Sequence, residues 1–288
     1  MKQAIALENS PHFLGYSGTG SESTGGQSDQ REQVEFATEL DAIWQEGMPL
    51  YERLRGPNQW PEAFPELRKV VNDYVQAMAR LGETFLGLVA QALSLSPETL
   101  LSFLSDQHRL KLVHYPASKP GDTGAASAQG VGPHKDSSGW WTFLLQASPP
   151  EVKGLQALNK AGQWVDIPVK PGTFVVNIGQ AFEVVTAGVC KATTHRVLSG
   201  LQERYSVPFF QGVRRDLTRT EARALSPHFA SFEEGIEPDQ AREIDSAFLH
   251  GKYDTWGETQ LRTKIRSHRD NGRIFYPEVF EDYIKDGN

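Results

Sequence analysis

Apolar residues recur at intervals of three and four along one segment in the first third of the chain, between Pro65 and Leu93. This spacing indicates an amphipathic helix, because residues three and four apart lie on the same helical face. The length of the pattern predicts a helix that braces a large neighbouring element. A second, shorter helix is predicted after it, where Ser96 stands as N-cap before Pro97.

Beyond Arg109 the apolar spacing changes from the helical pattern to that of short strands. Seven such runs follow, separated by turn residues, and they read LKLVHYP, WWTFLLQAS, LQALNK, WVDIPV, TFVVNIG, THRVL and RYSVPFFQG. Many short strands in about a hundred residues predict a β-sandwich or a barrel. The expected fold class is therefore mainly β with flanking helices.

The segments on either side of this β region lack such a pattern. Residues 1–35 read as loop, with Gly and Ser concentrated from Gly15 to Glu32. A second Gly-rich loop is expected from Ser118 to Pro133, and a polar helical extension is expected from Thr218 onward. We therefore expect one structural domain with three regions, namely a loop and helical support (1–108), a β core (109–215) and a C-terminal helical extension (216–288).

Composition narrows the function classes. The chain has 288 residues, 39% of them apolar, and a net charge of −7 with its positive charges scattered. These values exclude a disordered chain and give no electrostatic footprint for nucleic acid. The lone cysteine, Cys190, forms no disulfide framework and favours a reducing compartment. No signal peptide and no apolar run of about 18 residues is visible, so we expect a cytoplasmic protein that does not span a membrane.

Two histidine–aspartate pairs, each with one residue between its members, offer candidate metal ligands. His268 and Asp270 lie in the charged segment KIRSHRDNGR, which we expect on a solvated surface. His134 and Asp136 lie at the start of a predicted strand, where side chains two residues apart point to the same side. The pair of His134 and Asp136 is therefore either part of a metal site or a polar feature at the mouth of a strand.

His195, in the strand-like run THRVL, can supply a third ligand. Two histidines and one carboxylate on one face of a metal are typical of non-haem Fe(II) oxygenases, because this set leaves coordination positions open. A further same-face pair, Arg204 and Ser206, lies in RYSVPFFQG. A buried arginine needs an anion. This pair is therefore either a binding site for a carboxylate or part of an internal salt bridge.

These motifs occur in order, together with the stretch GLQALNKAGQWVDIPVKPGTFVVNIG. From about Gly15 to Gln211 the sequence resembles the isopenicillin N synthase-like branch of the Fe(II)/2-oxoglutarate-dependent dioxygenases. The resemblance implies a double-stranded β-helix, a jelly roll flanked by helices. It also implies that Fe(II) is held by His134, Asp136 and His195. The C5 carboxylate of 2-oxoglutarate would be held by Arg204, Ser206 and Tyr115, while Val113 stands where family members usually have asparagine.

The resemblance implies oxidation of a small organic molecule, a secondary metabolite, by hydroxylation, desaturation or cyclisation. Dioxygen would be the oxidant, 2-oxoglutarate would be decarboxylated to succinate, and ascorbate is a candidate reductant. The family's arrangement makes Phe210 and Tyr16 candidates for the wall of the substrate pocket. Trp141 is a candidate either for that pocket or for the apolar core.

Two alternatives to this function stay open. Isopenicillin N synthase and the aminocyclopropanecarboxylate oxidases share the scaffold and the arginine–serine pair, so an Fe(II) oxidase that does not consume 2-oxoglutarate is one. The other is an inactive relative that serves as a binding partner. Family members also carry a further strand and helix ahead of the Gly15 segment. We therefore expect an uncovered sheet edge here, through which a homodimer could form.

Overall fold

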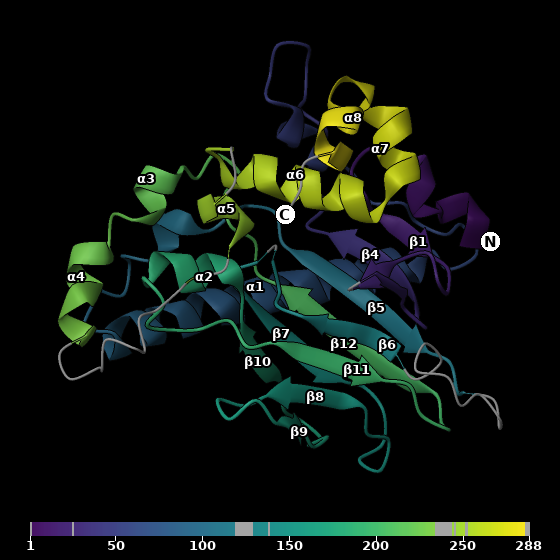
Figure 1. Ribbon diagram of the computed structural model, residues 1–288. Helices are drawn as coiled ribbons and strands as arrows, with labels where there is room; N and C mark the ends of the chain where they lie inside the picture. Colours follow the sequence, from purple (N-terminus) through teal and green to yellow (C-terminus); the bar gives the residue numbers. More distant parts are fainter. Residues whose placement is uncertain are drawn as a thin grey trace.

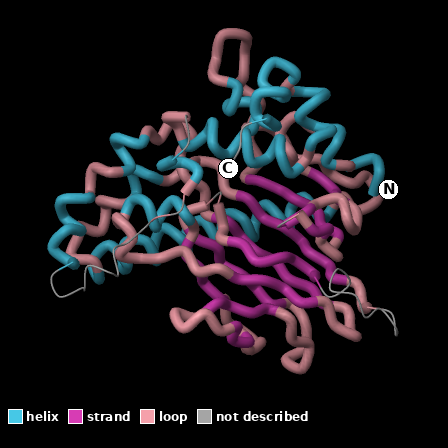
Figure 2. Tube along the Cα trace, viewed as in Figure 1, coloured by secondary structure: helices cyan, strands magenta, loops and turns pink. Residues whose placement is uncertain are grey.

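The computed structural model describes residues 2–285, apart from residues 25, 119–128, 138, 234–243, 245, 251 and 252. At its centre two antiparallel β-sheets lie face to face, and helices flank them (Figure 1). Figure 2 shows the helices gathered along one side of the molecule and most of the strands along the other. The predicted fold class, mainly β with flanking helices around a jelly-roll core, is confirmed.

The two main sheets differ in size, and neither follows the order of the chain. Across the larger sheet the order is β1 (Gly15–Ser17), β4 (Glu32–Ala37), β5 (Arg109–Tyr115), β12 (Arg204–Phe210), β7 (Trp141–Gln146) and β10 (Val175–Ile178). Across the smaller sheet it is β6 (Gln129–His134), β11 (His195–Leu198), β8 (Leu155–Leu158) and β9 (Trp164–Asp166). A separate hairpin consists of β2 (Ser23–Thr24) and β3 (Gln27–Ser28). The chain crosses between the two main sheets repeatedly, as in a jelly roll.

The two faces of the six-stranded sheet meet different layers, and strand alternation decides which side chains each face presents. Val113 and Tyr115 of β5 pack against apolar residues of the smaller sheet, namely Val131, Leu155 and Val197. We call this side the inner face. The opposite side, the outer face, carries Trp141, Phe143 and Phe209 in the main apolar core.

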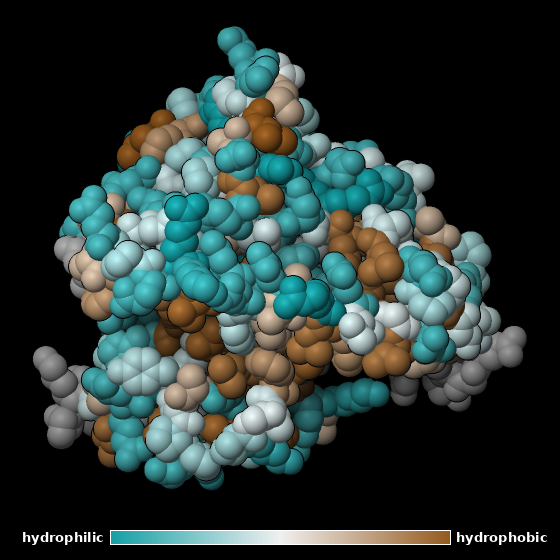
Figure 3. Space-filling view, turned by 180° about the vertical axis from the view of Figure 1, so that it is seen from behind, coloured by the Kyte–Doolittle hydropathy of each residue, from teal (hydrophilic) through white to brown (hydrophobic). Residues whose placement is uncertain are grey.

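Helix α1 (Glu66–Ala92) covers the outer face, which confirms the helix predicted from the apolar spacing. Its buried residues recur at intervals of three and four, and they are Val71, Val75, Met78, Gly82, Leu86 and Ala90. Packing of such a face, at about 25 cal/mol per Å² of apolar area, supplies most of the stability of a helix. Other apolar side chains of α1, including Val70 and Leu88, stay exposed. Figure 3 shows apolar patches among polar residues on this side of the molecule.

The region after β12 is helical, as predicted, and its last helices lie beside the N-terminal turns (Figure 1). Its helices are α3 (Arg219–Ala222), α4 (Ser226–Ala230), α5 (Ala247–His250), α6 (Trp256–Ser267), α7 (Arg269–Phe275) and α8 (Pro277–Lys285). One more helix, α2 (Gln180–Val185), joins β10 to β11. The 3-10 turns are η1 (Lys2–Ile5), η2 (Leu7–Asn9), η3 (Leu50–Leu54), η4 (Leu101–Phe103) and η5 (Ser231–Glu233). Helix α6 begins at a capping box of Thr255 and Glu258.

Three local predictions are wrong. Residues 1–35 are not all loop, because β1 and β4 form one side of the larger sheet. Strand β4 does carry an alternation, since Val34 and Phe36 lie between Gln33 and Glu35, but it is short and follows the Gly- and Ser-rich segment. Its inner-face residues, Gln33 and Glu35, are polar although buried. The second helix is only the turn η4. In the expected loop from Ser118 to Pro133, the residues from Gln129 onward belong to β6, and residues 119–128 lie outside the described residues.

The edge strand β1 contacts the N-terminal turns, since Ala6 forms a bridge with Tyr16. At Gly15 (φ +125°) a Cβ would lie 2.3 Å from the carbonyl oxygen of Ile5, so this contact requires glycine. The expected edge is thus partly covered on β1, and a homodimer through a sheet edge remains a prediction. Within the described part of the chain, no helix has the length and apolarity needed to cross a membrane.

Candidate metal and co-substrate site

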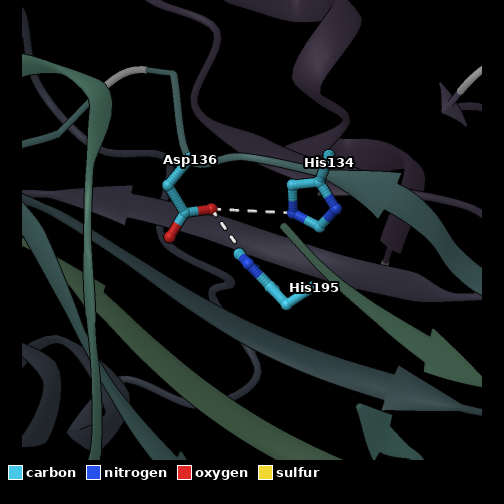
Figure 4. Close-up of side chains that lie close together, drawn as sticks. All are labelled: His134, Asp136 and His195. Atoms are coloured by element: carbon cyan, nitrogen blue, oxygen red, sulfur yellow. Dashed lines mark ion pairs between the residues drawn. The ribbon is translucent and has the colours of Figure 1, made fainter. Parts of the chain in front are cut away.

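The structure brings His134, Asp136 and His195 together where β6 and β11 pair (Figure 4). The two histidines are cross-strand partners, and Asp136 follows just after the end of β6. Its Oδ1 lies 3.6 Å from Nε2 of each histidine. Among the described residues no other group of three His, Cys, Asp or Glu side chains converges in this way.

Both imidazoles are oriented by a hydrogen bond at the ring nitrogen that faces away from Asp136. Nδ1 of His134 lies 2.8 Å from the carbonyl oxygen of Gly132, and Nδ1 of His195 lies 3.0 Å from that of Thr193. A carbonyl oxygen can only accept, so Nδ1 carries the proton in both neutral rings. Nε2 keeps its lone pair, as a metal ligand must. Burial lowers the pKa of His195, which favours the same neutral form.

Asp136 is buried and is held from behind by two polar side chains. Its Oδ2 accepts hydrogen bonds from Thr142 Oγ1 at 2.6 Å and from Asn177 Nδ2 at 2.5 Å, which leaves Oδ1 toward the histidines. Burial alone would raise the pKa of Asp136, but the two histidines and Thr142 hold it well below its usual range. Sequence reasoning missed Thr142 and Asn177. Their signal was a polar residue inside an apolar strand-like run.

Arg204 is 3% exposed and lies on the inner face, with its guanidinium carbon 4.9 Å from the ring centroid of Tyr115. Nη2 donates a long hydrogen bond of 3.4 Å to Gln146 Oε1, and Nη1 is buried without a partner. No carboxylate of the described residues accepts a hydrogen bond from this guanidinium. The internal salt bridge considered as an alternative is therefore not found among these residues.

The other two residues predicted to hold 2-oxoglutarate lie next to Arg204. Tyr115 is the cross-strand partner of Arg204, and Ser206 is the partner of Val113, so all four side chains share the inner face. Tyr115 and Ser206 are buried. Val113 puts an apolar side chain in this wall.

The three candidates for the substrate pocket lie on different faces. Phe210 is the cross-strand neighbour of Thr142, whose hydroxyl donates a hydrogen bond to Asp136. Phe210 therefore lies on the inner face. Trp141 precedes Thr142 and points to the outer face, where it is 1% exposed and packs against core rings. Tyr16 also lies on the outer face, where its hydroxyl donates to Glu32. The prediction of Trp141 and Tyr16 as pocket residues is wrong, because strand alternation turns both away from the triad.

The prediction that His268 and Asp270 lie on a solvated surface is partly wrong. The side chain of His268 is only 8% exposed, and its Nε2 lies 3.3 Å from Glu22 Oε1. Asp270 is exposed and pairs with Arg273. The expectation of a solvated surface therefore holds for Asp270 and is wrong for His268, whose neighbour in space lies far away in the sequence.

The triad fits a divalent metal of intermediate softness. Two neutral imidazoles and one carboxylate oxygen converge, and metal–ligand bonds of about 2.1 Å place adjacent ligands about 3 Å apart. Separations of 3.6 Å need only small side-chain shifts to reach that geometry. A facial set of this composition matches non-haem Fe(II). The fold and the site together define a jelly-roll protein of the non-haem iron oxygenase class.

Sequence comparison identifies the family within this class. Residues 107–213 match the 2OG-Fe(II) oxygenase superfamily, and residues 1–63 match the N-terminal region of the non-haem dioxygenases in morphine synthesis. The chain is 40% identical over 289 residues to the 2-oxoglutarate-dependent dioxygenase frbJ of Dothideomycetidae sp., covering 96% of this chain and 76% of that protein. It is 32% identical over 299 residues to a 2-oxoglutarate-dependent dioxygenase of Gibberella zeae, covering 97% and 77%. The chain belongs to the 2OG-Fe(II) oxygenase superfamily.

Solved structures agree on the fold. A putative 2OG-Fe(II) oxygenase family protein from Caulobacter crescentus superposes with a TM-score of 0.65 at 25% identity, covering 91% of this chain and 78% of that one. A full-length Neurospora crassa protein, solved in complex with alpha-KG, gives a TM-score of 0.64 at 21% identity, covering 91% and 76%. The predicted family and enzyme class are thus confirmed.

Proposed function

We propose that this chain is an Fe(II)- and 2-oxoglutarate-dependent oxygenase that hydroxylates, desaturates or cyclises a small organic molecule of secondary metabolism. Three features support the proposal: the converging triad, the buried arginine beside it, and the relatives named 2-oxoglutarate-dependent dioxygenases. In this proposal His134, Asp136 and His195 hold the metal. Bound Fe(II) supplies the activation of dioxygen that accompanies decarboxylation of 2-oxoglutarate to succinate, and ascorbate is a candidate for keeping the metal reduced.

The observation that supports the co-substrate is the guanidinium of Arg204, which has no carboxylate partner among the described residues. A buried cation without a carboxylate partner is costly, and an anion that arrives with the co-substrate removes this cost. A planar guanidinium matches a carboxylate through two parallel hydrogen bonds, and the Ser206 hydroxyl adds a short donor. Arg204 and Ser206 would thus hold the C5 carboxylate of 2-oxoglutarate, and the Tyr115 ring would close that corner.

The remaining residues orient the ligands and limit the access of water. Thr142 and Asn177 fix the Asp136 carboxylate, so the metal does not have to order it on binding. Apolar side chains of both sheets pack in this region, among them Leu144, Val175 and Val197, and they narrow the path by which water can reach it. Phe210 is the candidate that stays in the proposed substrate wall, because it shares the inner face with Thr142.

Succinate release tests the proposal. Purified protein with Fe(II), 2-oxoglutarate, ascorbate and dioxygen should convert 2-oxoglutarate to succinate slowly even without substrate, and Arg204→Met should strongly reduce this turnover when 2-oxoglutarate is below saturation. Oxygen consumption without succinate would favour the oxidase alternative. Failure of the protein to bind Fe(II) would favour the inactive alternative.

A further inference from the structure

A group of charged side chains is buried on the inner face of β4 and β5. Glu35 of β4 and Lys111 of β5 are cross-strand partners, and Arg109 lies two residues before Lys111 on the same face. Lys264 reaches this group from α6. These side chains are 0% to 16% exposed. So many charges in a largely buried position require partners, and the partners can be accounted for one by one.

The carboxylate of Glu35 is fully engaged. Its Oε1 accepts hydrogen bonds from Arg109 Nη1 and from Lys264 Nζ, the latter at 2.7 Å, and its Oε2 accepts from Lys264 at 3.0 Å. Lys111 Nζ lies 3.5 Å from Oε2, farther from the carboxylate than the nitrogen atoms of Arg109 and Lys264. One carboxylate therefore serves three cations at this point.

The neighbouring carboxylates are engaged as well. Glu22 accepts from Arg31 Nη2 at 2.7 Å and from Gln33 Nε2 at 2.6 Å, and His268 lies at 3.3 Å. Asp29 accepts from several donors, namely Thr24, Arg31, Gln129 and the backbone N–H of Gly132. No carboxylate of this cluster lacks donors, so a cationic ligand would find no acceptor free to bind it.

The cations, in contrast, outnumber the carboxylates. The cluster contains four cations (Arg31, Arg109, Lys111 and Lys264) and three carboxylates (Glu22, Asp29 and Glu35). Among the described residues Glu35, at 3.5 Å, is the one carboxylate within ion-pair distance of the Lys111 ammonium, and Nε of Arg31 is buried without a partner. Lys264 lies in the same excess of positive charge: burial, Arg109 and Lys111 together lower its pKa to about 8, against the opposing effect of Glu35. The cluster is therefore short of one anion.

The excess positive charge of this cluster lies on the same face of the larger sheet as the proposed reaction site. Lys111 and Tyr115 share one face of β5 and are four residues apart, about 13 Å along the strand. Strand β12 lies between β5 and β7. Strand β5 therefore lies about 10 Å from β7, which carries Thr142. Arg31 interacts with the Tyr115 hydroxyl. An anion at Lys111 would thus lie on the same sheet face as the co-substrate corner, at a distance from the triad that an extended small molecule can span.

We propose that Lys111 binds a carboxylate of the substrate, so that the molecule oxidised is a small organic acid. The reaction rests on the proposed function above, whereas the choice of ligand rests on the charge balance around Lys111. The carboxylate would anchor one end of the substrate on β5 while the carbon to be oxidised faces His134, Asp136 and His195. A neutral or cationic substrate would leave the excess positive charge unmatched.

Acetate is a suitable probe, because it is small enough to reach a carboxylate site whatever the rest of the substrate is. The thermal unfolding midpoint of the metal-free protein is measured in acetate and in uncharged acetamide, at constant ionic strength. Acetate should raise the midpoint of the wild type, and acetamide should not. Lys111→Gln should lose at least half of the acetate shift. Lys111→Arg, which keeps the charge, and Lys69→Gln, an exposed control on α1, should retain it.

Arg204 can also bind acetate, but it is present in all these proteins, so its contribution cancels in the comparison. An equal acetate shift in wild type and Lys111→Gln would overturn the proposal. So would a lower midpoint of Lys111→Gln without acetate, because it would make Lys111 a structural partner of Glu35. The experiment uses neither Fe(II) nor 2-oxoglutarate, so a negative result leaves the proposed oxygenase function untouched.

Discussion

His134 and His195 face each other across β6 and β11, with ring centroids 4.3 Å apart. Because they are cross-strand partners, the register of this strand pair sets the distance between the two candidate nitrogen ligands. A slip of one residue would turn one imidazole to the other face of the sheet. The third ligand, Asp136, depends on side chains of the opposite sheet, since Thr142 and Asn177 hold it. The site therefore requires the correct register of β6 and β11 and the correct packing of the larger sheet against them.

Removing a support of Asp136 should weaken metal binding without removing a ligand. Asn177→Ala leaves Oδ2 with one donor and frees the carboxylate to rotate, so Fe(II) affinity should fall about 10- to 100-fold. Anaerobic titration calorimetry measures this affinity. Thr142→Ser keeps a hydroxyl and should retain near wild-type affinity, whereas Thr142→Val should not. Unchanged affinity in both Asn177→Ala and Thr142→Val would show that Asp136 needs no such support.

Replacing Arg204 should affect the co-substrate and spare the fold. Arg204→Met should raise the KM for 2-oxoglutarate about 100-fold, since it removes a charge-assisted pair of hydrogen bonds. Arg204→Lys should recover only part of this loss, because an ammonium does not match a carboxylate through two parallel bonds. The matched control is Arg196→Met on β11, whose guanidinium stacks on Trp164. A KM that rises equally in the control would contradict the assignment.

Replacing Trp141 should affect stability and not substrate binding. The ring is 1% exposed and lies 4.9 Å from Phe85 and 5.3 Å from Phe182, centroid to centroid. Trp141→Ala should lower the free energy of unfolding by about 3–5 kcal/mol, as for other large buried aromatic residues. Urea unfolding at pH 7 measures the loss. Unchanged unfolding with a raised substrate KM would restore Trp141 to the pocket.

Acid should destabilise the protein before its carboxylates are protonated. Burial lowers the pKa of His268 to about 4, so the unfolded chain binds more protons than the folded one between pH 6.5 and 4. This contribution to stability is complete above pH 6.5 and is lost as the pH falls, up to about 3 kcal/mol. His108, with a pKa lowered to about 4 by burial, acts in the same direction.

The slope of unfolding free energy against pH tests this origin. Urea unfolding between pH 7 and 4.5 should show a smaller decline for His268→Gln than for the wild type. A decline of the same size in both proteins would mean that His268 is not buried as a neutral imidazole. Below pH 4.5 the loss of the Glu22 contacts should add to the decline, because the folded-state pKa of Glu22 is about 2.

The sequence was sufficient to predict the β core and the pair of His134 and Asp136, because both depend on local spacing, whereas His195 lies far along the chain. Strands β5 and β12 carry clear apolar alternation, and the resemblance supplied the pairing of distant His195 with His134. Strand β4 was missed although Val34 and Phe36 alternate with polar residues, since the alternation is short and follows a Gly- and Ser-rich segment. Gln33 and Glu35 are polar residues at buried positions. Their burial depends on Arg109, Lys264 and other partners far along the chain, which no local pattern reveals.

Side-chain direction was the second source of error. Trp141 and Thr142 are neighbours in one apolar run, yet one lies in the core and the other supports Asp136. The choice between them depends on which face of the sheet meets α1, a tertiary relationship. His268 was assigned to the surface for a similar reason. The charged residues around it are typical of an exposed helix, but Glu22 from the N-terminal segment covers it.

The most direct test of the central claim is the visible absorption of the anaerobic protein with Fe(II) and 2-oxoglutarate, in wild type and in His195→Ala. The account predicts a weak charge-transfer band from the chelated keto acid in the wild type and its loss in the variant. Absence of the band from a wild-type protein that has bound Fe(II) would contradict the proposed use of 2-oxoglutarate. Persistence of the band in His195→Ala would contradict the assignment of the metal site.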